Sequence, residues 1–330
     1  MKQYIKNVKI LCTGSYTPKK IYSNKYLEEL VDTNDKWIKD NLGISERRIA
    51  NDHECTSDLA SKAALNAIEF GNLKVDELDL IIVATATPDR LAPSTAAIVQ
   101  DKIKAYNAVA FDISAVCSGF LYGMSVANQY ISAGVYKNVM VIGADTFSKI
   151  TDWSRRDCVF FGDGAGAAIF SSTDDDNGFQ AFRLYTDGRG KFNFTIPAGG
   201  SEIPLSKDIL ENKLQYFQMN GRAVYETATK VLPEAISKVL NDSGLTIDDI
   251  DYMIPHQPSV KILEETAKII GLDWGKVMTN MNKYANTSGG TIPILLDEVF
   301  RSGKIKKGDI ILFAAVGSGW TYGASILKWV

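Results

Sequence analysis

The stretch LKVDELDLIIV, residues 73–83, returns in closely similar form as LTIDDIDYMIP, residues 245–255. From 73 to 245 and from 83 to 255 the offset is 172 positions, and apolar and acidic residues coincide along the whole stretch. A helical pattern precedes each copy, DLASKAALNAIEF in the first case and TKVLPEAISKVLND in the second. Because self-similarity at a constant offset marks repeated structural units, we expect two copies of one helix-and-strand unit.

The correspondence continues downstream of both copies. GVYKNVMVIGAD, residues 134–145, resembles GKIKKGDIILFAAV, residues 303–316. Between them, SSTDDDNG at 171–178 supplies the acidic, glycine-ended turn expected at a boundary, so we predict two halves, 1–174 and 175–330. Apolar strands alternate with helices in both halves, which favours an α/β fold with mixed, mostly parallel sheets.

Two further segments bear on the fold. GDGAGA, residues 162–167, has the glycines of a dinucleotide-binding loop, but such a loop must open a helix, whereas AAIFSS continues as a strand. We therefore interpret it as a hairpin turn. Residues 185–220 form one long irregular insert, for which a lid, a pocket wall and a plain surface excursion all stay open.

Composition excludes several classes of function. The 330 residues are 45% hydrophobic and 23% charged, with a net charge of -3 and no long basic run, so neither nucleic acid nor an anionic membrane surface is expected as a partner. No apolar run is long enough for membrane insertion, and we expect a cytoplasmic protein. Four cysteines without paired spacing and two histidines indicate free thiols and no metal site.

One cysteine stands at a position that favours chemistry. In FDISAVCSGFLYGMSVANQYI, residues 111–131, an apolar run ends at Val116 and helical spacing begins at Leu121, which predicts that Cys117 lies at a strand-to-helix turn. The N–H groups and dipole of a helix start favour a thiolate, so we expect a pKa below the ordinary value of about 8.5. Inert packing of the thiol is the structural alternative.

His256 and Asn286 are the other candidates for a site. His256, in YMIPHQPSV, follows the strand of the second repeat, and Asn286, in NKYANTSGGTIP, precedes a helical segment. Each lies where an apolar element ends, the usual place for site residues in α/β folds. A surface histidine and a helix-capping asparagine are the structural alternatives. His53 lies in a polar stretch and is the weaker histidine candidate.

Taken together, the motifs resemble those of the β-ketoacyl-acyl-carrier-protein synthase III family. FDISAVCSGF, FGDGAGAA, PHQPSVKI, ANTSGGTIP and GSGWTYGAS occur in that family's order, and DTNDKWIKDNLGISERRIA is similar to its N-terminal segment. The resemblance covers essentially the whole chain. It implies a thiolase-type, duplicated αβαβα five-layer sandwich, a homodimer, and carbon–carbon bond formation by decarboxylative Claisen condensation.

The resemblance also implies roles for individual residues. Cys117 would take an acyl group from acyl-CoA, and His256 and Asn286 would donate hydrogen bonds to the thioester oxygen of malonyl-acyl carrier protein. The backbone N–H groups of Cys117 and Ser318 would form the oxyanion hole. No metal or cofactor is implied, since thioesters of coenzyme A and phosphopantetheine enter as substrates.

Substrate-binding positions are less well matched. By resemblance they include Trp37 and Arg155. The sequence departs from the family's usual residues at four nearby positions, where an arginine, an asparagine, a phenylalanine and a second asparagine are common: Asn41, Ser259, Val316 and Arg222. The catalytic residues that the resemblance implies are retained, so these departures bear on recognition of the acyl donor and not on the chemistry.

Two more expectations concern the acyl group and the carrier. Ala92 stands where short-chain enzymes of the family have a phenylalanine that closes the partner subunit's acyl tunnel, so we expect a primer of medium length or longer. Leu91 or the insert at 185–220 filling that space is the alternative. Lys261 and Lys268, seven residues apart on a predicted helix, are candidates for docking an acidic carrier, with a solvated face as the alternative.

Other reactions remain open at this stage. The fold implied by the resemblance also supports acyl transfer to oxygen or nitrogen without condensation. A cysteine thioester hydrolase would use His256 as a general base beside Cys117. A binding protein without activity would not be acylated at all. Within condensation, primary fatty-acid synthesis and a specialised pathway such as polyketide or aryl-polyene assembly are both consistent with the sequence.

Overall fold

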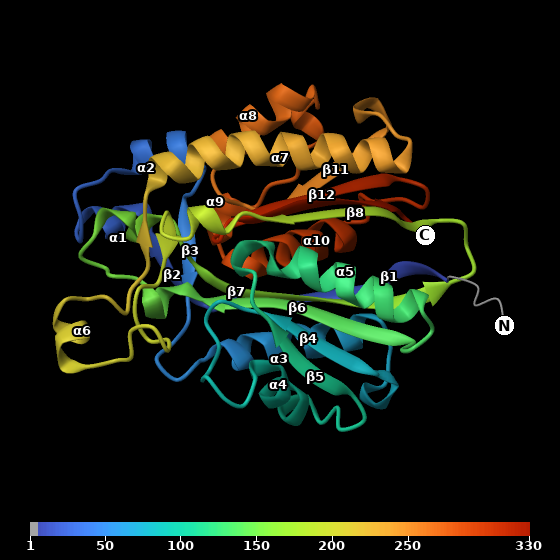
Figure 1. The fold of residues 1–330 in the computed structure, drawn as a ribbon, viewed down its shortest axis with the longest axis horizontal. Coiled ribbons are helices and arrows are strands. Elements are labelled where there is room, and N and C mark those ends of the chain that lie inside the picture. The colour runs from blue at the N-terminus through green and yellow to red at the C-terminus, as the bar shows by residue number, and fades with distance from the viewer. Residues whose placement is uncertain (1–5) are drawn as a thin grey trace.

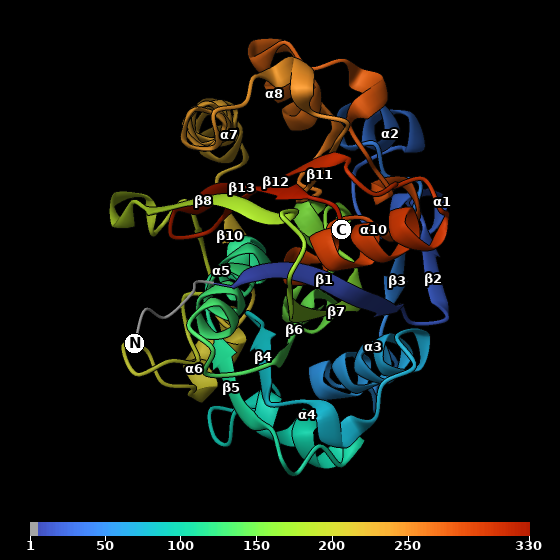
Figure 2. The ribbon, with the colours of Figure 1, turned by 90° about the vertical axis from the view of Figure 1, so that its right-hand side faces the viewer.

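Two large β-sheets and three layers of helices form the body of the protein, whose computed structural model describes residues 6–330 (Figures 1 and 2). The first sheet has the strand order β1-β7-β6-β4-β5, and the second has the order β11-β12-β13-β8. In Figure 2 the layers follow one another from top to bottom as helices, sheet, helices, sheet and helices. This arrangement confirms the predicted five-layer αβαβα sandwich.

The strands of the first sheet come from the first half of the chain: β1 (Asn7–Tyr16), β4 (Leu80–Ala84), β5 (Val109–Ile113), β6 (Asn138–Thr146) and β7 (Asp163–Thr173). Those of the second sheet come from the second half: β8 (Gly178–Thr186), β11 (Tyr252–Pro255), β12 (Ile310–Gly317) and β13 (Thr321–Lys328). Two small ladders pair β2 (Lys20–Ser23) with β3 (Glu46–Ile49), and β9 (Phe194–Thr195) with β10 (Gln218–Met219).

The helices cover both outer faces and fill the space between the sheets. The outer layers hold α3 (Thr56–Phe70) and α4 (Thr95–Ile103) on one side, and α7 (Gly221–Ser243) and α8 (Val260–Ile270) on the other. The central layer holds α5 (Gly119–Ser132) and α10 (Thr291–Arg301). The remaining short helices are α1 (Asn24–Glu28), α2 (Asp35–Leu42), α6 (Lys207–Glu211) and α9 (Met281–Tyr284).

The central helices explain why the two halves form one core. Phe120 and Met124 of α5 and Ile292 and Leu296 of α10 are fully buried, in a cluster that includes strand residues of both sheets. A helix between two sheets must be apolar around most of its circumference, and both segments have such a composition. The predicted boundary between 174 and 175 falls in the connection between β7 and β8. Contacts nevertheless cross it, because α10 of the second half packs against β1 and β7 of the first half.

The internal repeat is visible in the positions of the elements. The starts of β4 and β11 are 172 residues apart, as are those of β6 and β12 and those of α5 and α10. The sequence repeat therefore corresponds to a structural one, and the N-termini of the two central helices are equivalent positions in the two halves. The two equivalent helix starts, those of α5 and α10, both lie near the cavity described below.

The sheets are mixed, as expected, but they are not mostly parallel. Of the seven neighbouring strand pairs in the two described sheets, four are antiparallel, and three are parallel. β12 and β13 are joined by only three residues, and a connection this short allows only an antiparallel pair. The alternation of helices and strands in the sequence did not indicate these antiparallel pairs.

The prediction of a hairpin turn at 162–167 is wrong, because nearly all of this segment lies within β7. Its glycines serve close packing. A Cβ at Gly166 would lie 2.5 Å from the backbone carbon of Pro293, and one at Gly143 of β6 would lie 2.0 Å from the carbonyl oxygen of Gly289. The absence of side chains there lets the start of α10 approach the first sheet.

The insert at 185–220 forms part of a pocket wall. Phe194 and Phe217 stack at 5.6 Å between ring centroids and pack with Phe147 and Phe161 in one aromatic cluster. Between these two points the segment that carries α6 projects from the side of the molecule (Figure 1). Among residues 6–330 no helix is both long and apolar enough to cross a membrane.

Candidate active site

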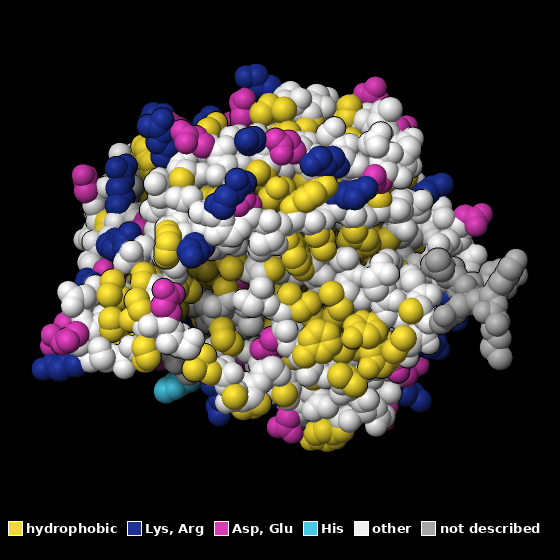
Figure 3. Space-filling view, in the orientation of Figure 1, with side chains coloured by type: hydrophobic (Ala, Val, Ile, Leu, Met, Phe, Trp, Pro, Cys, Tyr) yellow, Lys and Arg dark blue, Asp and Glu magenta, His cyan; other side chains and the backbone are white. Residues whose placement is uncertain are grey.

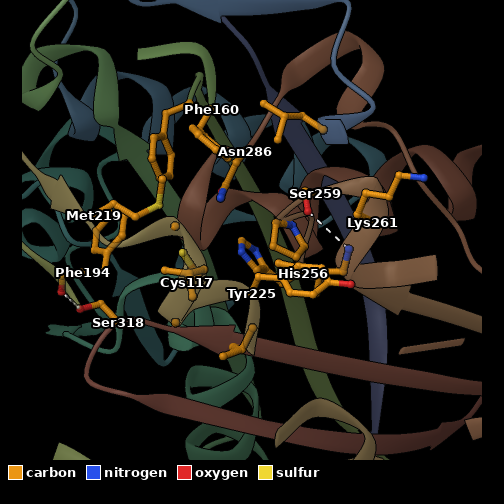
Figure 4. A pocket seen from close by; sticks show the side chains of 18 of the residues that line it. Cys117, Phe160, Phe194, Met219, Tyr225, His256, Ser259, Lys261, Asn286 and Ser318 are labelled. Atoms are coloured by element: carbon orange, nitrogen blue, oxygen red, sulfur yellow. Dashed lines mark hydrogen bonds between the residues drawn. The ribbon is translucent and has the colours of Figure 1, made fainter. Parts of the chain in front are cut away.

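A cavity of about 550 Å³ contains all three residues predicted to carry the chemistry. Cys117 comes from the first half of the chain and His256 and Asn286 from the second, yet their side chains converge at one point (Figure 4). Aromatic and aliphatic side chains make up much of the remaining wall: Trp37, Leu42, Phe160, Phe161, Phe194, Met219, Val224, Tyr225, Ile262, Val316 and Trp320.

Cys117 lies at the predicted strand-to-helix turn. It belongs to a single 3₁₀ turn, η2 (Val116–Ser118), between β5 and α5. Val116 has φ 47°, in the left-handed region that is costly for a β-branched residue, so the turn is strained at the residue before Cys117. The sulfur lies 3.6 Å from Ser288 Oγ, to which the thiol donates.

The expected lowering of the Cys117 pKa is wrong for the unliganded site. Cys117 is 8% exposed, and burial raises its pKa to about 12, opposed by the hydrogen bond with Ser288 and reinforced by the nearby charge of Asp145. The favourable helix start is thus outweighed by the loss of water around the thiolate. A thiol with this pKa is protonated at neutral pH.

His256 follows β11, and both its backbone and its ring are held by hydrogen bonds. Its backbone N–H donates to the carbonyl of Ala314 at 2.8 Å, which continues the pairing of β11 with β12. Its ring nitrogen Nδ1 lies 2.7 Å from Thr291 Oγ1, at the start of α10. Burial lowers the pKa of the ring to about 3, so the imidazole is neutral at any working pH.

Asn286 has its amide orientation set by the turn that follows it. Its Oδ1 accepts the backbone N–H of Ser288 at 2.8 Å, which leaves the two hydrogens of Nδ2 for the cavity. Its backbone is held from both sides, donating to Phe160 at 3.1 Å and accepting from Gly162 at 3.0 Å. In Figure 4 the nitrogens of Asn286 and His256 face the same space beside the sulfur of Cys117.

A second set of hydrogen-bond donors lies against Cys117. The turn between β12 and β13 passes so close that a Cβ at Gly317 would be 3.0 Å from the amide nitrogen of Cys117. Ser318 follows in this turn and lines the cavity, with its hydroxyl donating to the carbonyl of Phe194 at 2.6 Å. The turn thus brings the backbone of Ser318 and that of Cys117 to one wall, as an oxyanion hole requires.

The comparisons with known proteins identify the family. Residues 111–188 match the family described as 3-oxoacyl-[acyl-carrier-protein (ACP)] synthase III, and residues 240–329 match its C-terminal counterpart. The β-ketoacyl-[acyl-carrier-protein] synthase III of Caldanaerobacter subterraneus subsp. tengcongensis is 50% identical over 97% of both chains. That of Clostridioides difficile is 47% identical over 97% of this chain and 98% of its own. The chain belongs to the β-ketoacyl-acyl-carrier-protein synthase III family.

Solved structures place the fold within the same group. The 3-oxoacyl-[acyl-carrier-protein] synthase III of Aquifex aeolicus is 40% identical with a TM-score of 0.90, covering 98% of this chain and all of that one. The priming β-ketosynthase of the R1128 polyketide pathway is 27% identical with a TM-score of 0.91, covering 100% of this chain and 98% of that one. The fold alone therefore does not separate fatty-acid from polyketide members.

In this synthase III family member, the residues predicted to bind substrate are only partly together. Trp37 and Val316 line the cavity. Arg155 does not line it and forms an ion pair with Asp157 at 2.6 Å, whereas the next residue, Arg156, lies over the Trp37 ring at 4.6 Å. The sequence analysis selected Arg155 and missed Arg156. The two adjacent arginines in WSRRD were the signal that either one could be the substrate-binding residue.

Most of the remaining predicted positions lie outside the cavity. Arg222 is exposed and pairs with Glu226 at 2.7 Å, without lining the cavity. Lys261 does line it, and Lys268 lies further along α8 with 78% of its side chain exposed. Both lysines have a glutamate neighbour on the same helix, which reduces their net charge. Ala92 is exposed and absent from the lining, so it reaches no acyl group bound in its own chain.

A buried carboxylate that the sequence did not single out braces the site. Asp145, at the end of β6, accepts from the backbone of Gly289 at 2.9 Å and of Ala86 at 2.8 Å, and from Thr87. Burial raises its pKa, while these hydrogen bonds oppose the shift. The carboxylate ties the turn after Asn286 to the end of β4, and only its position after an apolar strand could have signalled it.

Proposed function

We propose that this family member joins an acyl group to a malonyl thioester in two half-reactions at Cys117. The observation that supports this most directly is the convergence of one thiol with two side-chain nitrogens, those of His256 and Asn286, in a single apolar cavity. A thiol accounts for acyl transfer, and a pair of fixed donors accounts for a developing enolate.

In the first half-reaction, Cys117 takes the acyl group from acyl-CoA. Its sulfur forms a bond to the acyl carbonyl carbon, the bond from that carbon to the coenzyme A sulfur breaks, and the thiol proton ends on the departing sulfur. The carbonyl oxygen becomes negative in between, and the backbone N–H groups of Cys117 and Ser318 are the proposed donors to it.

In the second half-reaction, malonyl-acyl carrier protein loses carbon dioxide. The electron pair of the broken bond forms an enolate, whose oxygen accepts from His256 and Asn286. The enolate carbon bonds to the acyl carbon, and the sulfur of Cys117 leaves and regains a proton from solvent. A neutral His256 suits this role, since it does not hold the malonyl carboxylate by charge.

The cavity mouth fits thioesters of large, anionic carriers. Arg156 over Trp37 offers a cation and an aromatic face to a coenzyme A molecule, and Lys261 offers a cation beside the opening. We propose acyl-CoA and malonyl-acyl carrier protein as partners, with no metal or other cofactor. The four cysteines are free, which suits a reducing compartment and supports the cytoplasm as the location.

A homodimer is part of the proposal. β5 is an edge strand of the first sheet and pairs on one side only among the described strands. Val109, its first residue, is 50% exposed, and hydrophobic side chains gather around α5 and β5 on the face in Figure 3. An open apolar edge favours pairing with a second copy. Such a dimer would bring Ala92 of one subunit toward the other.

Loading followed by condensation tests the proposed function. After incubation with acyl-CoA, mass spectrometry should find the acyl group on Cys117, and malonyl-carrier should then convert it to a β-ketoacyl product with release of carbon dioxide. Cys117→Ala should not load. Cys12→Ala is the matched control, because Cys12 is also buried and burial also raises its pKa to about 12. Clearance of the acyl group by water alone would instead favour a hydrolase.

A further inference from the structure

The side chain of Ser318 joins the turn between β12 and β13 to the insert at 185–220. Its hydroxyl donates to the carbonyl oxygen of Phe194 at 2.6 Å. Phe194 is the first residue of β9 in the insert, and it lines the cavity together with Ser318. The sequence analysis assigned a role to the backbone N–H of Ser318 and none to its hydroxyl, which therefore needs an explanation.

The carbonyl of Phe194 is available for this bond because of its place in the β9–β10 ladder. Phe194 lies opposite Met219 of β10. In the next pair along the ladder, the backbone N–H of Asn220 donates to the carbonyl of Asn193. Hydrogen-bonded and non-hydrogen-bonded pairs alternate in an antiparallel ladder, so the carbonyl of Phe194 points away from β10. Ser318 thus pairs with a carbonyl that the neighbouring strand does not reach.

The backbone around Ser318 has little restraint of its own. Gly317 and Gly319 flank Ser318, and Gly319 has φ 134°, a conformation that residues with a side chain rarely adopt. Beyond Gly319, the backbone of Trp320 is held by two hydrogen bonds with that of Asp187, at 2.8 and 2.6 Å. The hydroxyl of Ser318 is therefore the only side-chain group in the run 317–319 that can restrain these peptide units.

We infer that Ser318 is a positioning residue, whose hydroxyl fastens the turn at 317–320 to β9 and so holds its own backbone N–H toward the oxyanion of the loading step. The inference rests on the proposed function for its catalytic consequence, whereas the fastening itself is independent of any reaction. It gives the insert a part in acyl loading beyond that of a pocket wall. An acyl group that presses on Phe194 also acts, through Ser318, on a donor of the oxyanion hole.

Loading kinetics test the positioning role. Ser318→Ala removes the hydroxyl but keeps the backbone N–H, so its maximal rate of Cys117 acylation should fall about 10- to 100-fold, as for a small misplacement of a catalytic group. The acyl-CoA concentration at half-maximal rate should change little. Decarboxylation of malonyl-carrier should fall much less, because it uses the donors of His256 and Asn286. Ser318→Thr keeps a hydroxyl and should load at nearly the wild-type rate.

Ser325→Ala is the matched control. Ser325 is buried in β13, and its hydroxyl donates to the carbonyl of Ala181 in β8 at 3.0 Å, a bond of the same kind that lies outside the cavity lining. Its loss should lower the thermal stability and leave the loading rate unchanged. Wild-type loading by a folded Ser318→Ala, or an equal slowing in Ser325→Ala, would overturn the positioning role.

Hydrogen–deuterium exchange separates this inference from the proposed function. In the full-length protein without substrate, Ser318→Ala should raise amide exchange in peptides that cover 190–198 and 316–320, whereas Ser325→Ala should not. Unchanged exchange in Ser318→Ala would overturn the fastening whatever reaction the enzyme performs. If exchange rises as expected but the wild type is never acylated by acyl-CoA, the proposed function is wrong and the fastening stands.

Discussion

Replacing Asn286 by alanine should separate the two half-reactions. The substitution removes the Nδ2 donor that faces the cavity but leaves Cys117, its turn and the β12–β13 backbone untouched. Loss of one preorganised donor to an oxyanion costs about 3 kcal/mol, so malonyl decarboxylation should fall about 10²- to 10³-fold. Acyl loading depends on other donors and should continue near the wild-type rate.

The same substitution has a structural cost that must be distinguished from the chemical one. Oδ1 of Asn286 accepts the N–H of Ser288, a buried residue held at φ 51°, and losing this acceptor should destabilise the protein by about 1–3 kcal/mol. Asn286→Asp keeps an acceptor for Ser288 and so should recover stability. When ionised it offers no donor, so its decarboxylation should improve as falling pH protonates the carboxyl.

Stopped-flow measurement of acyl loading and of carbon dioxide release from malonyl-carrier, with thermal unfolding of each variant, tests this reasoning. We expect Asn286→Ala to load, to be less stable and not to decarboxylate at a useful rate. Loss of loading with decarboxylation intact would show that the roles of the two half-sites are exchanged. Wild-type rates of both steps in Asn286→Asp at neutral pH would show that Asn286 serves the turn and not the enolate.

Three further outcomes follow from the structure. Because burial raises the pKa of Cys117 to about 12, its alkylation by iodoacetamide should accelerate about tenfold per pH unit from about pH 7 to 10, read by mass spectrometry; a plateau below pH 9 would contradict a buried thiol. Reversing the charge of Lys261 and Lys268 together should raise the KM for malonyl-carrier at low salt more than at high salt, and an unchanged KM would place docking elsewhere. Ala92→Phe should shift primer preference toward acetyl in competition among acyl-CoA chain lengths, whereas a wild-type enzyme that already prefers acetyl would exclude an open tunnel.

The sequence determined the duplicated architecture and the place of Cys117 at a strand-to-helix turn. Both depend on local patterns: the repeat at 73–83 and 245–255 reappears as equivalent strands, and the change of apolar spacing at Cys117 reappears as a turn between β5 and α5. Periodicity reports which face of an element is buried, so such features can be read without knowing the neighbours. The choice of His256 over the exposed His53 followed from the same reasoning.

Tertiary structure decided the properties that depend on neighbours distant in the sequence. Burial raised the pKa of Cys117 where the helix start alone predicted a lower one, because desolvation depends on everything packed around the thiol. Gly164 and Gly166, which suggested a turn at 162–167, lie in a strand against which α10 packs. The hydroxyl of Thr291 meets His256 only because the start of α10 packs beside the end of β11, and no local pattern specifies that these two side chains, 35 residues apart, meet.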